Sequence, residues 1–137
     1  MTRTRILAAS GAFLVAAVAG AGAQGAKPAL YTAEQAQAGA TIYAQACATG
    51  HGGALEGGSA PALKGADYNG RAAAQGATPQ SLHDVVVNTM PQTDPGGLKP
   101  EEYNAVVSYL LQQNGFPAGT AALAPGAPGM KETRVAP

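Results

Sequence analysis

The chain has a single cysteine, and a histidine follows it closely: Cys47 and His51 flank the segment Ala48-Thr49-Gly50. One thiol cannot form an intrachain disulfide, so Cys47 is either a buried, inert side chain or is covalently occupied by another group. A further soft donor, Met90, lies later in the chain and is followed by Pro91. Because thiol, imidazole and thioether groups are common ligands of transition metals, these side chains are the candidates for chemistry.

The segment Cys47-Ala48-Thr49-Gly50-His51 is one residue short of Cys-x-x-Cys-His, the attachment signature of c-type haem. In that signature two thiols form thioethers with the haem vinyl groups, and the histidine binds the iron. Gly50 stands at the position of the second thiol. Met90-Pro91 can present a thioether to iron, and histidine–methionine ligation is an established haem arrangement.

With these features the chain resembles the small class I c-type cytochromes over roughly residues 31 to 119. Its last part is similar to cytochromes that accompany periplasmic dehydrogenases. The matching segments are Gly39-Ala40-Thr41-Ile42-Tyr43, His51-Gly52-Gly53, Ala60-Pro61-Ala62-Leu63, Leu82, Met90-Pro91, Leu98 through Tyr109-Leu110-Leu111, and Asn114-Gly115-Phe116-Pro117-Ala118-Gly119.

The resemblance implies one haem c, attached by a single thioether through Cys47. His51 is then the proximal iron ligand and Met90 the distal one, and the carbonyl of Pro61 accepts a hydrogen bond from the other His51 nitrogen. It also implies a one-electron carrier that links a periplasmic dehydrogenase to an oxidase or to another cytochrome. We find no nucleophile–base pair and no paired carboxylates, so we predict no catalytic residues and no enzymatic activity.

Gly50 leaves three alternatives open: a singly tethered haem, a non-covalent haem, or a haem-free docking or structural module. A blue-copper electron carrier is a rival, since Cys47, His51, His83 and Met90 nominally supply its ligand set. Copper sites of that kind lie in β-sandwiches, whereas no alternating strand pattern is present here. We expect His83 to face solvent. Cys47 and Met90 also have a plain interpretation as core side chains.

Composition narrows the function classes. The 137 residues have a formal net charge of zero and only 12% are charged, so the clustered basic surface of a nucleic-acid-binding protein is lacking.

Arg3 and Arg5 precede an apolar run from Ile6 to about Gly20, and the small residues Ala21-Gly22-Ala23 follow. We therefore predict a signal peptide over residues 1–23, cleaved near Ala23, and a periplasmic protein without a membrane span; a retained anchor is the alternative.

Helices must position the candidate residues, and we predict an all-α, cytochrome c-like fold with three to four helices around one haem. One helix is expected from Ala33 to about Ala46, capped by Thr32, and another from Pro100 to about Asn114. A shorter helix is expected to start at Thr78-Pro79. Further predicted segments are an N-terminal extension over 24–31, a cytochrome c domain over 32–118, a loop from Gly52 to Gly76, and a disordered tail over 119–137. Met130 lies in this tail, and we assign it no role.

Overall fold

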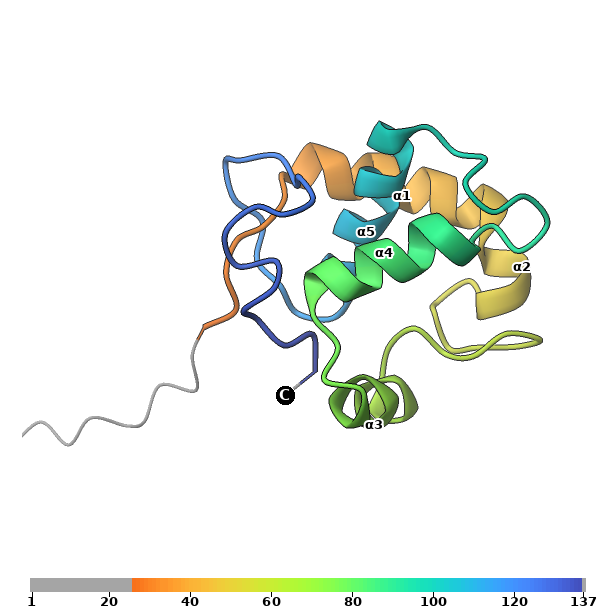
Figure 1. Ribbon diagram of the computed structural model, residues 1–137. Helices are drawn as coiled ribbons and strands as arrows, with labels where there is room; N and C mark the ends of the chain where they lie inside the picture. Colours follow the sequence, from red (N-terminus) through yellow and green to blue (C-terminus); the bar gives the residue numbers. More distant parts are fainter. Residues whose placement is uncertain (1–25, 137) are drawn as a thin grey trace, which may run out of the picture.

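A computed structural model describes residues 26–136, and the expected signal peptide lies outside these residues. Five helices follow one another along the chain, and no strand occurs in the part described (Figure 1). They are α1 (Ala33–Ala46), α2 (Ala48–His51), α3 (Ala66–Ala74), α4 (Pro79–Thr89) and α5 (Pro100–Gln113). The all-α prediction is therefore confirmed, with α3 and the short α2 added to the three helices located from sequence.

The starts of the three located helices are those the sequence predicts. Thr32 and Gln35 form a reciprocal capping box at the start of α1, with hydrogen bonds of 3.2 and 3.3 Å. Thr78 caps α4 in the same way, through Ser81. Pro100 occupies the first turn of α5, where a missing N–H costs nothing.

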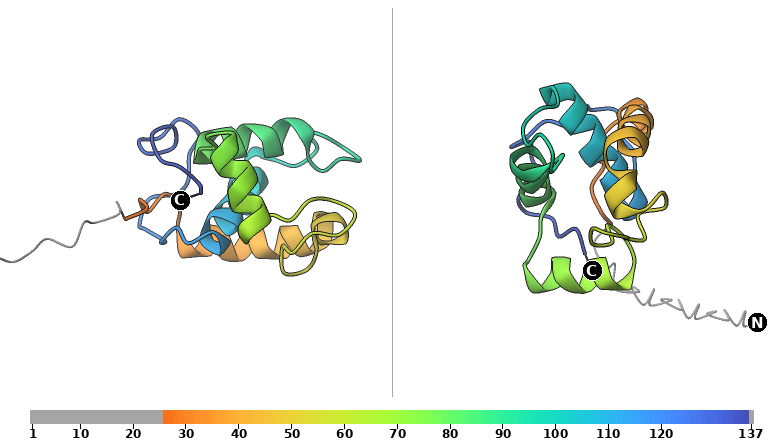
Figure 2. Two further views of the ribbon diagram at one scale, coloured as in Figure 1. Left: turned by 90° about the horizontal axis from the view of Figure 1, so that it is seen from below. Right: turned by 90° about the vertical axis from the view of Figure 1, so that its right-hand side faces the viewer.

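α1 and α5 cross closely, and Gly39 lies at the crossing. A Cβ atom built on Gly39 would lie 1.9 Å from the carbonyl oxygen of Ala105, so only glycine allows the two backbones to approach this far. The rings of Tyr43 and Tyr109 pack beside the crossing, with centroids 5.3 Å apart. α4 packs on α5 and α3 runs across the end of the group (Figure 2).

The prediction of a loop between Gly52 and Gly76 is wrong over its second half, where α3 forms. Tyr68 and Ala72 are its buried residues. They supply only one pair at helical spacing, and Gly70 and Asn69 lower helix propensity, so the pattern is weak. α3 is held in place by packing rather than by propensity.

The prediction of a disordered tail is also wrong. Residues 120–136, which we call the strap, have no regular secondary structure but pack against the helices. Four of its side chains are buried in the core, and hydrogen bonds join it to α1, α4 and the turn before α4. The buried residues are Leu123, Met130, Val135 and Ala136. A few well-spaced apolar side chains thus order a segment whose composition is typical of disorder.

Candidate functional site

A cavity of about 720 Å³ opens between the helices and gathers the four residues singled out from sequence. Cys47, His51, Pro61 and Met90 all line it. In the end-on view of Figure 2 (right), α1 and α2 border one side, α4 borders the opposite side, and α3 crosses below. His51 ends α2 and Met90 follows α4, so the two residues come to the cavity from different elements.

His51 is the last residue of α2, and its ring is held by the loop that follows. Its Nδ1 lies 2.7 Å from the carbonyl oxygen of Pro61. Because a carbonyl can only accept, Nδ1 carries the proton and Nε2 keeps a free lone pair, the form of imidazole that binds metal. Two backbone hydrogen bonds fix the loop: Gly57 donates to His51 and Ala60 donates to Gly50.

Cys47 joins α1 to α2 and is half-buried. Its N–H donates to the carbonyl of Tyr43 at the end of α1, and its own carbonyl accepts from His51 at 3.0 Å. Burial raises the pKa of the Cys47 thiol, so the neutral thiol is favoured.

Gly50 does not need to be glycine for conformational reasons. Its φ is not in the left-handed region, and an added Cβ would meet only Ala60 Cβ at 3.3 Å and Ser59 Oγ at 3.9 Å. A small side chain fits there after a slight shift of the neighbouring loop. The backbone therefore retains room for a second thiol where the sequence has none.

Met90 ends α4 in an extended conformation, as expected for a residue before proline. Its carbonyl accepts a 2.7 Å hydrogen bond from the hydroxyl of Tyr103, which is buried in α5. The Met90 side chain is half-buried and packs at the edge of the core. The turn after α4 is thereby fastened to α5.

The donor set and the cavity fit a haem. Pockets for ligands of this class measure about 300–1,000 Å³ and are mostly apolar, and the walls here are mainly apolar, with Leu82, Val106 and Leu110 among them. The lining holds both an imidazole with a free Nε2 and a thioether, and these are the two groups of the histidine–methionine donor set of haem iron. Cys47 supplies a thiol beside the imidazole. Among residues 26–136, Arg71 is the only lysine, arginine, aspartate or glutamate in the lining.

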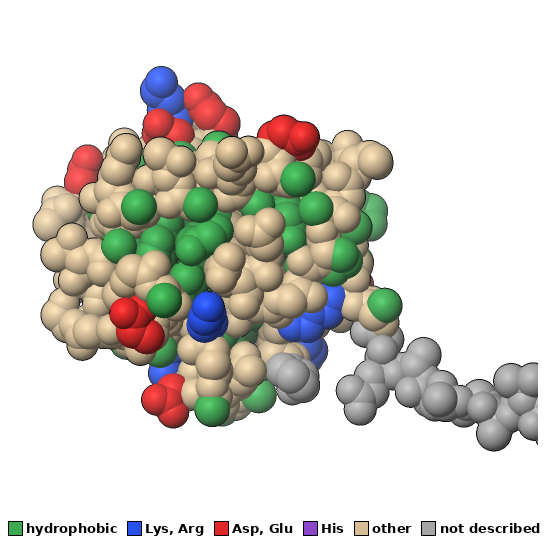
Figure 3. Space-filling view, turned by 180° about the vertical axis from the view of Figure 1, so that it is seen from behind, with side chains coloured by type: hydrophobic (Ala, Val, Ile, Leu, Met, Phe, Trp, Pro, Cys, Tyr) green, Lys and Arg blue, Asp and Glu red, His purple; other side chains and the backbone are tan. Residues whose placement is uncertain are grey.

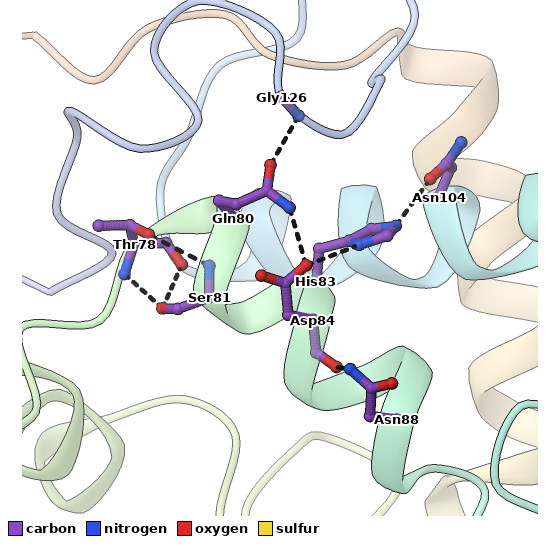
Figure 4. A network of polar contacts seen from close by, with 8 residues as sticks. All are labelled: Thr78, Gln80, Ser81, His83, Asp84, Asn88, Asn104 and Gly126. Carbon is purple, nitrogen blue, oxygen red and sulfur yellow. Dashed lines mark hydrogen bonds and ion pairs between the residues drawn. The ribbon is translucent and has the colours of Figure 1, made fainter.

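His83 is not part of this site, and the expectation that it faces solvent is wrong. It is buried between α4 and α5, and its Nε2 lies 3.0 Å from Asn104 Oδ1 (Figure 4). Its Nδ1 has no hydrogen-bond partner and lies 3.7 Å from a carboxylate oxygen of Asp84. His83 does not line the cavity, so the blue-copper ligand set is not assembled.

Sequence reasoning missed the contribution of α3. Tyr68, Arg71, Ala72 and Gln75 line the cavity from this side. Their spacing of three and four residues places them on one helical face, and this was the signal available. Burial raises the pKa of Tyr68 to about 12, and the positive charge of Arg71 opposes the shift.

The outer surface carries few charges. On the face opposite that of Figure 1, hydrophobic side chains gather across the middle and charged ones lie mainly toward the margins (Figure 3). Among residues 26–136, no helix has the length and apolar character needed to cross a membrane.

Comparison with known proteins identifies a family. The family model described as "Cytochrome C oxidase, cbb3-type, subunit III" matches residues 34–110, more than half of the chain. The matched segment includes Cys47, His51, Pro61 and Met90. No curated protein and no solved structure gave a match.

Proposed function

Since the chain belongs to the cytochrome c family described as subunit III of cbb3-type cytochrome c oxidase, and is thus an electron-transfer haem protein, we propose that it carries one haem c with His51 and Met90 as iron ligands. When bound, haem supplies a one-electron couple between ferrous and ferric iron. The observation that carries the proposal is that His51 and Met90 line one largely apolar cavity together with Cys47 and Pro61.

A contact within this chain supports each proposed ligand role. The Pro61 carbonyl orients the His51 ring and keeps the proton on Nδ1, which increases the basicity of Nε2 as a ligand. Tyr103 fastens the backbone of Met90, so the thioether is presented from a fixed turn. A thioether ligand raises the reduction potential and favours the ferrous state.

We further propose that the haem is attached by a single thioether through Cys47. The thiol lies in the same cavity as His51, and Gly50 offers no second sulfur. Arg3, Arg5 and the apolar run after them support export to the periplasm. There the protein passes electrons from a dehydrogenase to an oxidase or another cytochrome, an assignment that rests on the resemblance of its sequence.

The proposal is tested by intact-mass spectrometry of the exported protein, produced together with haem-attachment machinery. We expect a mass of one chain plus one haem that survives acid–acetone extraction, and a signal-peptide cleavage near Ala23. The variant Cys47→Ser should release its haem on extraction, and His51→Ala should lose the proximal ligand. Gly50→Cys serves as the positive control for attachment. A haem-free wild type beside a fully loaded Gly50→Cys variant would contradict the proposal and favour a haem-free module.

A further inference from the structure

The strap lies outside the segment matched by the family model, yet it contacts the helix that ends at Met90. It runs back over the end of the molecule away from α2 (Figure 1). Met130 and Val135 are fully buried, so the strap is part of the core and is not a loose appendage.

The strap binds the first turn of α4. The carbonyl of Met130 accepts from the backbone N–H of Gln80 at 2.8 Å. This N–H belongs to the first turn of a helix, where no intrahelical acceptor is available. The N–H of Gly126 donates to Gln80 Oε1 at 2.6 Å, and Gln80 Nε2 donates to Asp84 Oδ1 at 2.8 Å (Figure 4). The strap therefore caps the start of α4. Through the Gln80 side chain it is also linked to Asp84, one turn further along the helix.

The strap also holds the turn that leads into α4. The N–H of Val135 donates to the carbonyl of Ala77 at 2.9 Å, and the Arg134 guanidinium donates to the carbonyl of Gly76. The Lys27 ammonium group also binds this part of the strap, because it donates to the carbonyl of Val135 at 2.7 Å. Ala77 lines the cavity, so the strap is hydrogen-bonded to a residue of the cavity wall.

The position of the start of α4 determines the position of Met90 at its other end. Leu82, Val85 and Val86 of α4 line the cavity, and Met90 follows at its far end. A helix behaves as a rigid element over this length, so a shift of its capped start moves its end. Tyr103 holds only the backbone of the Met90 turn.

We propose that the strap is a positioning element, with Met130 as its key residue, that sets α4 so that the Met90 thioether is presented to the haem. The inference rests on the proposed function. It assigns a role in ligation to residues that neither touch the haem cavity nor lie in the matched segment.

The test compares three holoprotein variants with the wild-type holoprotein. Met130→Ala removes the fully buried side chain of the residue whose backbone carbonyl binds Gln80 of α4, and Met130→Leu restores its bulk. Leu123→Ala is the matched control, because Leu123 is also buried in the strap but its backbone bonds to Gln35 at the start of α1. Both truncations are expected to lower global stability, so ligand measurements are made where all proteins are folded.

The readout is imidazole binding to the ferric protein, which requires Met90 to leave the iron. We expect Met130→Ala to bind imidazole about tenfold more tightly, because loosening α4 raises the fraction of protein that is competent to bind. Its methionine-to-iron charge-transfer band should weaken and its reduction potential should fall. Met130→Leu and Leu123→Ala should stay within about twofold of wild type, a change below 1 kcal/mol.

Equal imidazole affinities for Met130→Ala and Leu123→Ala would overturn the positioning role, since the strap would then act only through global stability. A wild type that holds haem but lacks the charge-transfer band would overturn the Met90 assignment together with this inference. A haem-free wild type would overturn the proposed function itself. The wild-type spectrum therefore distinguishes a failure of the function from a failure of the strap inference.

Discussion

The close crossing of α1 and α5 makes a sharp prediction for Gly39→Ala. The added methyl carbon would lie 1.9 Å from the carbonyl oxygen of Ala105 and 2.4 Å from its carbonyl carbon. Both are backbone atoms, so no side-chain rotation relieves the overlap. Ordinary carbon–oxygen contacts begin near 3.3 Å, so the helices must separate by about 1.4 Å at this point.

Separating the two helices lowers the free energy of unfolding, because packing contacts between them are lost. A gap of 0.5–1 Å already forfeits a quarter to a half of the dispersion energy of the contacts involved, and α1 buries Ala36 and Tyr43 beside Gly39. Overpacking typically costs 1–3 kcal/mol and sometimes more, so we assign about 3–4 kcal/mol to this backbone clash. Alanine returns about 1 kcal/mol of helix propensity, which leaves a net loss of about 2–3 kcal/mol.

Gly70→Ala is the matched control, because Gly70 lies in α3 with no atom within 4 Å of an added Cβ. Only the propensity term acts there, so this variant should gain about 0.5–1 kcal/mol. Urea unfolding of the holoproteins at equal haem loading measures both, and the midpoint of Gly39→Ala should fall by about 1–2 M. A Gly39→Ala protein as stable as wild type would refute the close-approach argument.

Three further predictions concern the site. Gly50→Cys should form a second thioether, shift the reduced pyridine–haem α-band to shorter wavelength, and raise stability by about 1–3 kcal/mol by analogy with a cross-link; an unchanged α-band at full loading would contradict this. Met90→Ala should lower the reduction potential and admit exogenous ligands, as potentiometry and imidazole titration would report. Burial, with the nearby Cys47, Tyr109 and Glu56, raises the pKa of Tyr43 to about 12 from 10.0. The folded state therefore retains this proton, stability falls as pH rises from about 10 to about 12, and urea midpoints of Tyr43→Phe should fall less over that range.

Local signals made α1, α4 and α5 predictable. Thr32 and Thr78 mark helix starts because their side chains accept from backbone N–H groups that have no partner within the helix, and Pro100 does so because its φ is fixed at a helical value. Both kinds of signal depend on residues at most four positions apart. The grouping of Cys47, His51 and Met90 was predicted from the resemblance, because spacing along the chain does not by itself fix distance in space.

The features that were missed depend on long-range packing. His83 lies next to Asp84 in a helix, and its burial depends on how α4 meets Asn104 of α5. Met130 lies among glycine, alanine and proline, and it is ordered by burial in the core and by the hydrogen bond that its carbonyl accepts from Gln80. α3 similarly depends on the cavity that it closes. No local pattern indicates the burial of His83 or the order of the strap, and for α3 the only local signal was the weak helical spacing of its cavity-lining residues.

The position of Cys47 at the junction of α1 and α2 has a consequence for refolding. With the single tether proposed here, the cofactor stays on the chain after unfolding, four residues from the imidazole that must recapture its iron. Short flexible connections give effective concentrations in the millimolar range, so rebinding is intramolecular and its rate does not depend on how dilute the protein is. One tether is sufficient for this, and a second would mainly restrict orientation. Under the proposed attachment, the Cys47 sulfur is therefore enough to retain the cofactor, and a second thioether is not required for that purpose.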